Sequence, residues 1–234
     1  MIDSGSMIKI DYTAKIIEND EEGDIKEFVF DTTIEEISKS ENIFKPENIY
    51  QPMLIVLGKK WIPTGLERAI INANVNETID VVIQPEDAYG PKDPAKIKLV
   101  ARREFQKLNI NPSVGDRITL GSQTGTILSV SAGRVRIDYN HILAGKEIHY
   151  SVKIYDIIKG DEQKISALIK RRIPGADLEN MTIEIKEDKI IVNLPEQARF
   201  FEYIQFAKAE VAKDISEILT NYKYIEFSEI FPII

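Results

Sequence analysis

No constellation of side chains for acid–base or nucleophilic chemistry is visible in the sequence. Its only histidines are His141 and His149, it has no cysteine, and it has no glycine-rich phosphate loop. Thiol catalysis, disulfides and thiolate metal sites are therefore excluded. Two histidines without a clustered third ligand do not predict a metal site either. The sequence thus predicts no metal and no cofactor, which leaves aromatic and apolar groups as the candidates for chemistry.

The turn Ala88-Tyr89-Gly90 marks the point where the sequence changes character. An apolar strand is predicted just before it, at residues 78–83. The interrupted pattern resumes at His141-Ile142, which leads into a second predicted strand at 147–154. We interpret the residues between as a guest domain inserted into a host.

The host must supply the elements that position any site. Residues 7–16 alternate apolar and polar side chains, which is typical of a half-buried strand, and further strands are predicted at 25–30 and 51–58. Residues 61–71 predict a short helix, since Leu66, Ala69 and Ile70 share one face. These elements predict an α+β domain with a curled antiparallel sheet packed over a short helix.

The inserted segment is predicted to be mostly β. A strand at 95–100 and a short helix at 102–108 precede three short strands, at 117–120, 125–130 and 133–139. A segment this small cannot bury everything that it presents. From the residues alone, a well-packed decoration with no exposed groove stays one interpretation of the insert.

Residues 160–234 predict a further α+β unit in the order α-β-β-α-β. A helix from Asp161 precedes a hairpin at 181–194, a long helix at 195–219 and a strand at 222–230. The long helix carries apolar side chains on more than one side of its axis: Phe200, Phe201, Ile204, Phe206 and Val211. Such a surface favours a homodimer interface, and a plain autonomous domain is the alternative.

Composition and charge indicate the compartment in which we expect the chain to act and the partners it would not bind. Its 234 residues carry a net charge of −8, which disfavours nonspecific nucleic-acid binding. No apolar run approaches the roughly 18 residues that cross a bilayer, and residues 1–6 lack the basic and apolar stretches of a signal peptide. We expect a cytoplasmic protein that binds neither nucleic acid nor membrane.

Four motifs, taken in order, resemble a known family: Tyr12-Thr13, Phe30-Asp31, Gly65-Leu66-Glu67 and Ala88-Tyr89-Gly90. Together they resemble the FKBP-type peptidyl-prolyl isomerases over about residues 7–160. The insertion after Ala88-Tyr89-Gly90 resembles the SlyD branch, and the whole chain resembles the long archaeal members. The resemblance implies an isomerase domain at 1–91 and 140–159, an insert-in-flap chaperone domain at 92–139 and a C-terminal domain at 160–234.

The resemblance implies a reaction that needs no acid–base group. Rotation about a prolyl bond faces a barrier of about 18–20 kcal/mol, which comes from amide resonance. In the twisted transition state the carbonyl loses negative charge, so a dry apolar pocket stabilises that state better than water does. The expected partners are unfolded or partly folded polypeptides that contain Xaa-Pro bonds.

The resemblance also assigns residues to this pocket. The catalytic set would be Tyr12, Phe30, Asp31, Ile62, Leu66, Tyr89 and Tyr150, and the substrate-binding walls would be Met53, Trp61, Ile142 and Leu143. Tyr89 would donate a hydrogen bond to a substrate carbonyl, and Asp31 would order a neighbouring tyrosine. Taken singly, each of these residues also suits a plain core position.

The sequence departs from the family's motif at the residue whose backbone N–H would donate to a substrate carbonyl. Thr64 stands as an extra residue between Pro63 and Gly65, so either Ile62 or Pro63 occupies the donor position. We favour Ile62 because proline has no N–H. Thr64 and Met53 also favour a rival function, a chaperone or adaptor that kept the fold and lost catalysis. A metal-handling protein is a third alternative, opposed by the missing cysteines.

Overall fold

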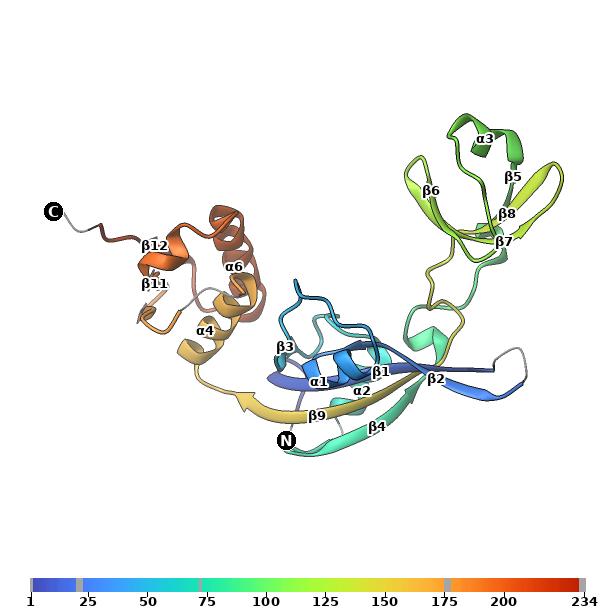
Figure 1. Ribbon diagram of the computed structural model, residues 1–234. Helices are drawn as coiled ribbons and strands as arrows, with labels where there is room; N and C mark the ends of the chain where they lie inside the picture. The colour runs from blue at the N-terminus through green and yellow to red at the C-terminus, as the bar shows by residue number, and fades with distance from the viewer. Residues whose placement is uncertain (1, 20–22, 72, 175–177, 232–234) are drawn as a thin grey trace. The chain divides into compact units, whose positions relative to one another are not determined.

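The computed structural model describes residues 2–19, 23–71, 73–174 and 178–231. It confirms the predicted α+β class, with mostly antiparallel sheets and few helices (Figure 1). The chain divides into two compact units, one formed by residues 1–82 with 149–234 and the other by residues 83–148. The domain boundaries drawn from the sequence stay a prediction.

The first unit is built on the strand β1 (Met7–Asn19). Neighbouring strands follow the order β2 (Ile25–Thr32), β1, β9 (Ile148–Ile158) and β4 (Thr78–Ile83), and β3 (Met53–Val56) pairs with the beginning of β1 (Figure 1). The alternation of apolar and polar side chains predicted for this strand is confirmed by their burial: Ile8 and Ile10 are fully buried, and Lys9 between them is exposed. The pairing places Ile10 opposite Met53 and Ala14 opposite Asp31.

Two helices accompany this sheet, α1 (Glu35–Ser40) and α2 (Thr64–Ile71). The predicted apolar face of α2 is buried, with Leu66 and Ile70 at most 1% exposed. The helix begins three residues later than the sequence predicted. The carbonyl of Pro63 accepts the N–H of Glu67 at 3.0 Å, and a residue that precedes proline disfavours helical backbone angles.

The insert forms a small four-stranded sheet with a helix packed on one face. The short turn η1 (Pro85–Asp87) precedes the insert, whose elements are η2 (Pro94–Lys96), β5 (Ile97–Ala101), α3 (Arg102–Lys107), β6 (Arg117–Leu120), β7 (Gln123–Val130) and β8 (Arg134–Asp138). The strand order is β5-β8-β7-β6, and Phe105 of α3 packs on Ile127, Val135 and Ile137. Gly125 is required here, because a Cβ would lie 2.7 Å from the Ile137 side chain.

The C-terminal segment keeps the predicted order of elements: α4 (Asp161–Arg172), β10 (Thr182–Lys186), β11 (Lys189–Asn193), α5 (Glu196–Arg199), α6 (Ile204–Ile218) and β12 (Tyr224–Ser228). The single long helix predicted at 195–219 is wrong. The chain leaves the helix after Arg199, and Tyr203 takes a left-handed conformation with φ 61° before α6 starts. This break lets Ala198, Phe201 and Ile204 all pack on one core.

That core is shared with the sheet built on β1. Met7, Leu54 and Val56 are buried in one cluster with side chains of the C-terminal elements, among them Leu168 and Ile169 of α4. Polar contacts reinforce the packing, since the Lys59 ammonium donates to the carbonyl of Glu217 at 2.6 Å. Within the described part of the chain, no helix is long and apolar enough to cross a membrane.

Candidate active site

A short hydrogen bond joins two of the expected site residues across neighbouring strands. The Tyr12 hydroxyl of β1 donates to Asp31 Oδ2 of β2 at 2.6 Å. The backbone of Tyr12 is held as well, because its N–H donates to Thr33 Oγ1 at 2.9 Å and its carbonyl accepts the N–H of Thr33 at 3.1 Å. Both ends of Tyr12 are therefore fixed, and its ring has one preferred direction.

Tyr12 and Asp31 line a cavity of about 530 Å³ together with Met53. This volume lies within the roughly 300–1,000 Å³ that ligand pockets occupy. The other lining residues come from the neighbouring strands, the loop before β3 and the helix α4: Lys9, Thr32, Thr33, Glu47, Asn48, Ile49, Tyr50, Gln51, Pro52, Leu54, Ala167, Lys170, Arg171 and Pro174. No histidine or cysteine is among these described lining residues, and the Asp31 carboxylate in the lining is already engaged by the Tyr12 hydroxyl.

Other expected site residues of the same unit lie beside this cavity or in the core. The Tyr150 ring, 5% exposed, lies 6.1 Å from the Tyr12 ring in a tilted arrangement. Leu66 and Ile62 are buried, and Phe30 is half-buried. Whether Ile62 supplies the backbone donor stays a prediction.

Trp61 lies against the C-terminal segment. The Arg171 guanidinium stands 3.9 Å from the centre of the Trp61 ring, which is a favourable cation–π geometry. The ring also packs on the shared core. Trp61 is not among the residues that line the cavity, and its role in substrate binding stays a prediction.

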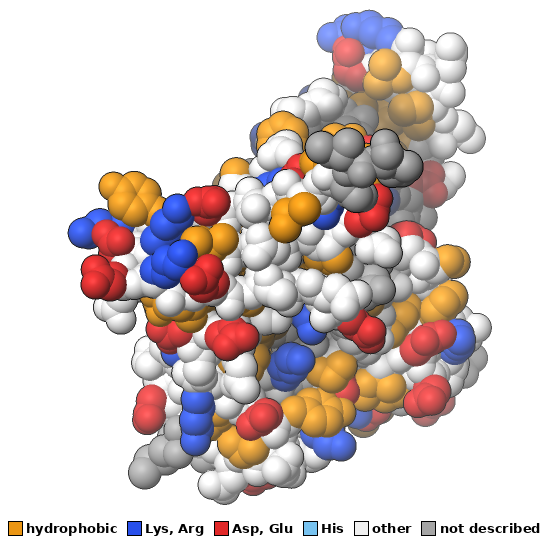
Figure 2. Space-filling view, turned by 90° about the vertical axis from the view of Figure 1, so that its left-hand side faces the viewer, with side chains coloured by type: hydrophobic (Ala, Val, Ile, Leu, Met, Phe, Trp, Pro, Cys, Tyr) orange, Lys and Arg blue, Asp and Glu red, His pale blue; other side chains and the backbone are white. Residues whose placement is uncertain are grey.

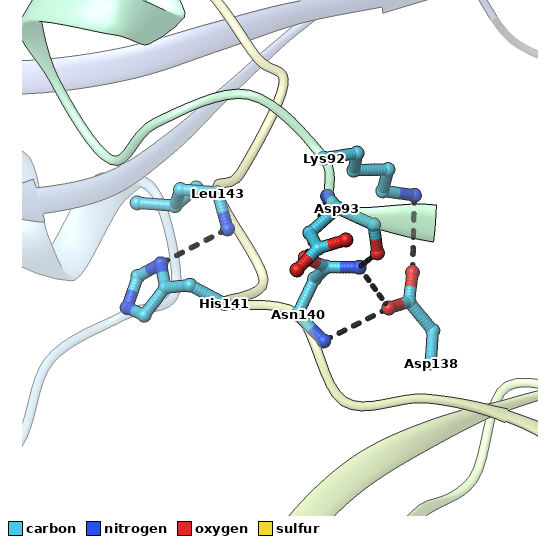
Figure 3. A network of polar contacts seen from close by, with 6 residues as sticks. All are labelled: Lys92, Asp93, Asp138, Asn140, His141 and Leu143. Atoms are coloured by element: carbon cyan, nitrogen blue, oxygen red, sulfur yellow. Dashed lines mark hydrogen bonds and ion pairs between the residues drawn. The ribbon is translucent and has the colours of Figure 1, made fainter. Parts of the chain in front are cut away.

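The remaining expected site residues belong to the unit at 83–148. The ring of Tyr89, 37% exposed, stacks on His141 at 4.6 Å with the planes 2° apart. The N–H of Leu143 donates to His141 Nδ1 at 3.2 Å (Figure 3). Ile142 is 55% exposed and Leu143 is 7% exposed. The side chain of Ile142 is therefore accessible to a substrate, and that of Leu143 is largely buried.

A polar network ties together the two segments that lead into and out of the insert (Figure 3). The Asn140 side chain accepts the N–H of Asp93 at 3.0 Å and donates to the Asp93 carbonyl at 2.9 Å. It also donates to Asp138 Oδ1 at 2.7 Å, and the Lys92 ammonium lies 3.3 Å from Asp138 Oδ2. Burial alone would raise the pKa of Asp138, but the bonds from Asn140 and Lys92 outweigh it and hold that pKa below its ordinary value of 3.8.

Comparison with known proteins decides the family. The model of the FKBP-type peptidyl-prolyl cis-trans isomerases matches residues 1–106, that of the FKBP26 IF domain matches 98–143, and that of the FKBP26 C-terminal segment matches 161–232. The short-type peptidyl-prolyl cis-trans isomerase of Methanocaldococcus jannaschii is 33% identical over 157 residues, which cover 67% of this chain and 94% of that protein. The chain belongs to the FKBP-type peptidyl-prolyl isomerases.

Bacterial members of the family are similar as well. The SlyD isomerase of Helicobacter pylori is 32% identical over 131 residues, covering 55% of this chain and 71% of that protein. The 16 kDa isomerase of Escherichia coli is 28% identical over 111 residues, covering 45% and 74%. The crystal structure of the three FKBP domains of wheat FKBP73 aligns with 68% of this chain and 40% of that one, at 15% identity and a TM-score of 0.32.

Family membership confirms the predicted resemblance and the predicted activity. This FKBP is a peptidyl-prolyl cis-trans isomerase of the SlyD-like kind, with an inserted IF domain. The relatives are all named as isomerases, which favours catalysis over the non-catalytic adaptor that the sequence left open.

Sequence reasoning missed one wall of the cavity. Ala167, Lys170, Arg171 and Pro174 line it from α4 and the residue pair that follows. The family motifs in the sequence end before residue 160, so they gave no indication that a C-terminal helix would take part. The only available signal was the exposed cationic pair Lys170-Arg171 at the end of an amphipathic helix.

Proposed function

We propose that this FKBP isomerises prolyl bonds in its Tyr12–Asp31 cavity by holding the twisted amide in an apolar setting. The observation that carries the proposal is the 2.6 Å bond from the Tyr12 hydroxyl to Asp31, at the edge of a cavity walled by Met53. Asp31 keeps the tyrosine ring in place, so the aromatic face meets the proline without first losing conformational freedom.

Catalysis in this setting is differential binding. The twisted amide has a less polar carbonyl than the planar one, so a desolvated aromatic and thioether wall favours it over the ground state. No proton changes place in such a reaction. The charged side chains that line the cavity then act on the flanking residues of the substrate and not on the amide.

The experiment that tests this pocket is a proline-isomerisation assay on a short Xaa-Pro peptide. The rate should be nearly flat from about pH 6 to 8, because no group near the ordinary histidine pKa of about 6.5 takes part. Met53→Ala should lower kcat/KM by about tenfold, since it removes a wall of the cavity. The matched control is Phe28→Ala, because Phe28 is 47% exposed on the neighbouring strand and does not line the cavity.

A bell-shaped pH profile intrinsic to the enzyme would contradict a mechanism without acid–base groups. Equal activity of Met53→Ala and Phe28→Ala would show that the cavity is not where the prolyl bond turns. Circular dichroism of both variants separates loss of function from loss of fold.

We also propose that the insert holds unfolded client chains and makes this FKBP a folding chaperone. Large apolar side chains stand exposed on it, with Leu99 at 61%, Leu108 at 55% and Val114 at 67%. Exposed apolar groups on so small a domain favour transient contacts with other chains. The clients would be unfolded or partly folded polypeptides with Xaa-Pro bonds, met in the cytoplasm.

We further propose that the C-terminal segment joins two copies of the chain. Phe200, Tyr203 and Phe206 are 76%, 69% and 73% exposed. The rings of Tyr203 and Phe206 lie 6.4 Å apart, so they form one apolar surface. Figure 2 looks at the side where α6 and β12 lie in Figure 1 and shows hydrophobic side chains among charged ones. A two-fold axis would let this surface meet itself.

A further inference from the structure

Charge is divided unevenly along the chain. Residues 92–139 hold nine lysines and arginines against four aspartates and glutamates, a net charge of +5. The rest of the chain holds 21 basic residues against 34 acidic ones, a net charge of −13. A polyanion or an acidic peptide is therefore attracted by the insert and repelled by the remainder.

Part of this positive charge is arranged on one face of the insert sheet. Along β8, Arg134 and Arg136 are exposed while Val135 and Ile137 between them are fully buried. Side chains alternate between the two faces of a strand, so both arginines lie on the face opposite the core. Arg117 lies on this same face. It pairs with Thr126, and Thr126 pairs with Asp138. Asp138 is two residues beyond Arg136 on β8, so its side chain is on the same face as that of Arg136.

An exposed apolar side chain stands among these arginines. Leu99 of β5 pairs directly with Arg136 and is 61% exposed. We call Leu99, Arg117, Arg134 and Arg136 the arginine face. Directly opposite residues in a sheet lie about 4.5–5.5 Å apart at their Cβ atoms, so one extended ligand can touch an apolar and a cationic group together.

The arginines of this face are not neutralised within the insert. In residues 83–148, all of which the structure describes, none of their side chains forms an ion pair or a hydrogen bond. The acidic side chain on the same face is Asp138, and it is bound by Lys92 at 3.3 Å and by Asn140 at 2.7 Å. The guanidinium groups are thus left to bind an external anion.

The type of anion follows from what else the insert presents. Nucleic-acid surfaces of this size stack bases on exposed aromatic rings, but Phe105 is fully buried and Tyr139 packs against the same core. An exposed leucine suits a polypeptide instead. The sheet order leaves β5 and β6 as edge strands, and edge strands accept an extended peptide by main-chain hydrogen bonds.

We propose that the arginine face binds extended client segments in which carboxylates lie beside apolar residues. The proposal rests on the capture role proposed above for the insert and names the class of client that it takes. Guanidinium groups bind carboxylates in a bidentate manner, which gives both strength and direction. Client chains of this kind would be steered to the insert, because the remainder of the molecule repels them.

The test is fluorescence anisotropy of labelled peptides with the full chain at low salt. One peptide alternates Glu and Leu among Ser and Thr, a second carries Lys in place of Glu, and a single-stranded thymidine oligonucleotide serves as a polyanion without apolar side chains. The Glu–Leu peptide should bind tightest, and added salt should weaken it. Arg134→Gln with Arg136→Gln should weaken it by at least about fivefold.

The matched control makes the same change of charge elsewhere on the insert. Lys96→Gln with Arg103→Gln removes two exposed positive charges outside the arginine face, and binding should stay within about twofold. Thermal unfolding should be unchanged in both double variants, since all four side chains point to solvent.

Four results would overturn the proposal, and they separate it from the broader capture role. Equal losses in the two double variants would mean that net charge matters and this face does not. Equal binding of the Lys and Glu peptides would leave client capture standing and remove the preference for acidic segments. Tighter binding of the oligonucleotide would assign the face to nucleic acid, and no binding of any probe would remove the capture role as well.

Discussion

At the scale of residues, we propose that this FKBP relies on side chains that are fixed in place and not on side chains that titrate. Tyr12 is held through its hydroxyl by Asp31 and through its backbone by Thr33, and Tyr150 packs beside its ring. Family motifs identified Tyr12 and Asp31 from the sequence. They could not identify Thr33 as the residue that fixes the strand, because that contact depends on the register between β1 and β2.

The clearest titrating contact lies where the insert joins its host. The bonds from Asn140 and Lys92 hold the pKa of Asp138 below its ordinary value of 3.8. A depressed carboxylate pKa stabilises the fold above the unfolded-state pKa, and the stabilisation is lost as the pH falls through the folded-state pKa. The junction should therefore be stable at neutral pH and loosen below about pH 4.

Amide hydrogen exchange in the segment 92–140 checks this expectation. Wild type should lose protection as the pH falls below about 4, whereas Asp138→Asn should already be less protected at neutral pH and change less on acidification. An unchanged pH dependence in Asp138→Asn would show that another group governs the junction.

At the scale of elements, the periodicity of apolar side chains predicted most of the fold. The strands of the insert and its helix lie within a few residues of their expected positions, since each has a regular pattern bounded by glycine or proline. The prediction of one helix at 195–219 was wrong because the pattern of apolar residues does not show where the backbone breaks. The break lies at Tyr203, which takes a left-handed conformation before α6 begins. The periodicity of apolar side chains carries no information about a residue with positive φ.

We expect the contact between Arg171 and Trp61 to contribute to the packing of α4 on the isomerase sheet. Arg171→Ala removes a guanidinium that lies 3.9 Å from the ring centre. It should lower the free energy of unfolding by about 1 kcal/mol, in the range of partly buried cation–π pairs. Trp61 is the only tryptophan in the chain, so its fluorescence during urea unfolding reports on this contact directly.

Lys170→Ala is the control, because Lys170 is the exposed neighbour on the same helix and forms no such contact. A similar loss of stability in both variants would attribute the effect to helix α4 in general. An unchanged stability in Arg171→Ala would mean that the shared apolar core alone holds the two parts together.

At the scale of the whole molecule, the C-terminal segment has two different apolar surfaces. One is buried with Met7, Leu54 and Val56 in the shared core. The other, formed by Phe200, Tyr203 and Phe206, remains exposed. The sequence predicted exposed Phe200 and Phe206 here, but from a single helix that is wrong, and it did not name Tyr203. It could not reveal the first surface, because contacts between distant segments are not encoded in local periodicity.

Phe206→Glu tests the proposed dimer. A carboxylate placed in an apolar contact loses its hydration without gaining a partner, so association should weaken by at least about tenfold. Light scattering at tens of micromolar should give a dimeric mass for the wild type and a smaller mass for the variant. Glu202→Gln, on the same turn, should leave the mass unchanged. A monomeric wild type would end the dimer proposal.

We propose that one FKBP chain captures clients with its insert and turns their prolyl bonds in a separate cavity. The most direct measurement compares wild type with a variant in which residues 94–139 are replaced by a short glycine-containing turn. This design keeps Asp93 and Asn140, whose mutual hydrogen bonds close the junction at 3.0 and 2.9 Å. Both proteins are assayed on a short Xaa-Pro peptide and on proline-limited refolding of a whole protein. Short-peptide isomerisation should stay within several-fold, whereas refolding should fall far more, because capture raises the local concentration of prolyl bonds. Equal losses in the two assays would contradict the account.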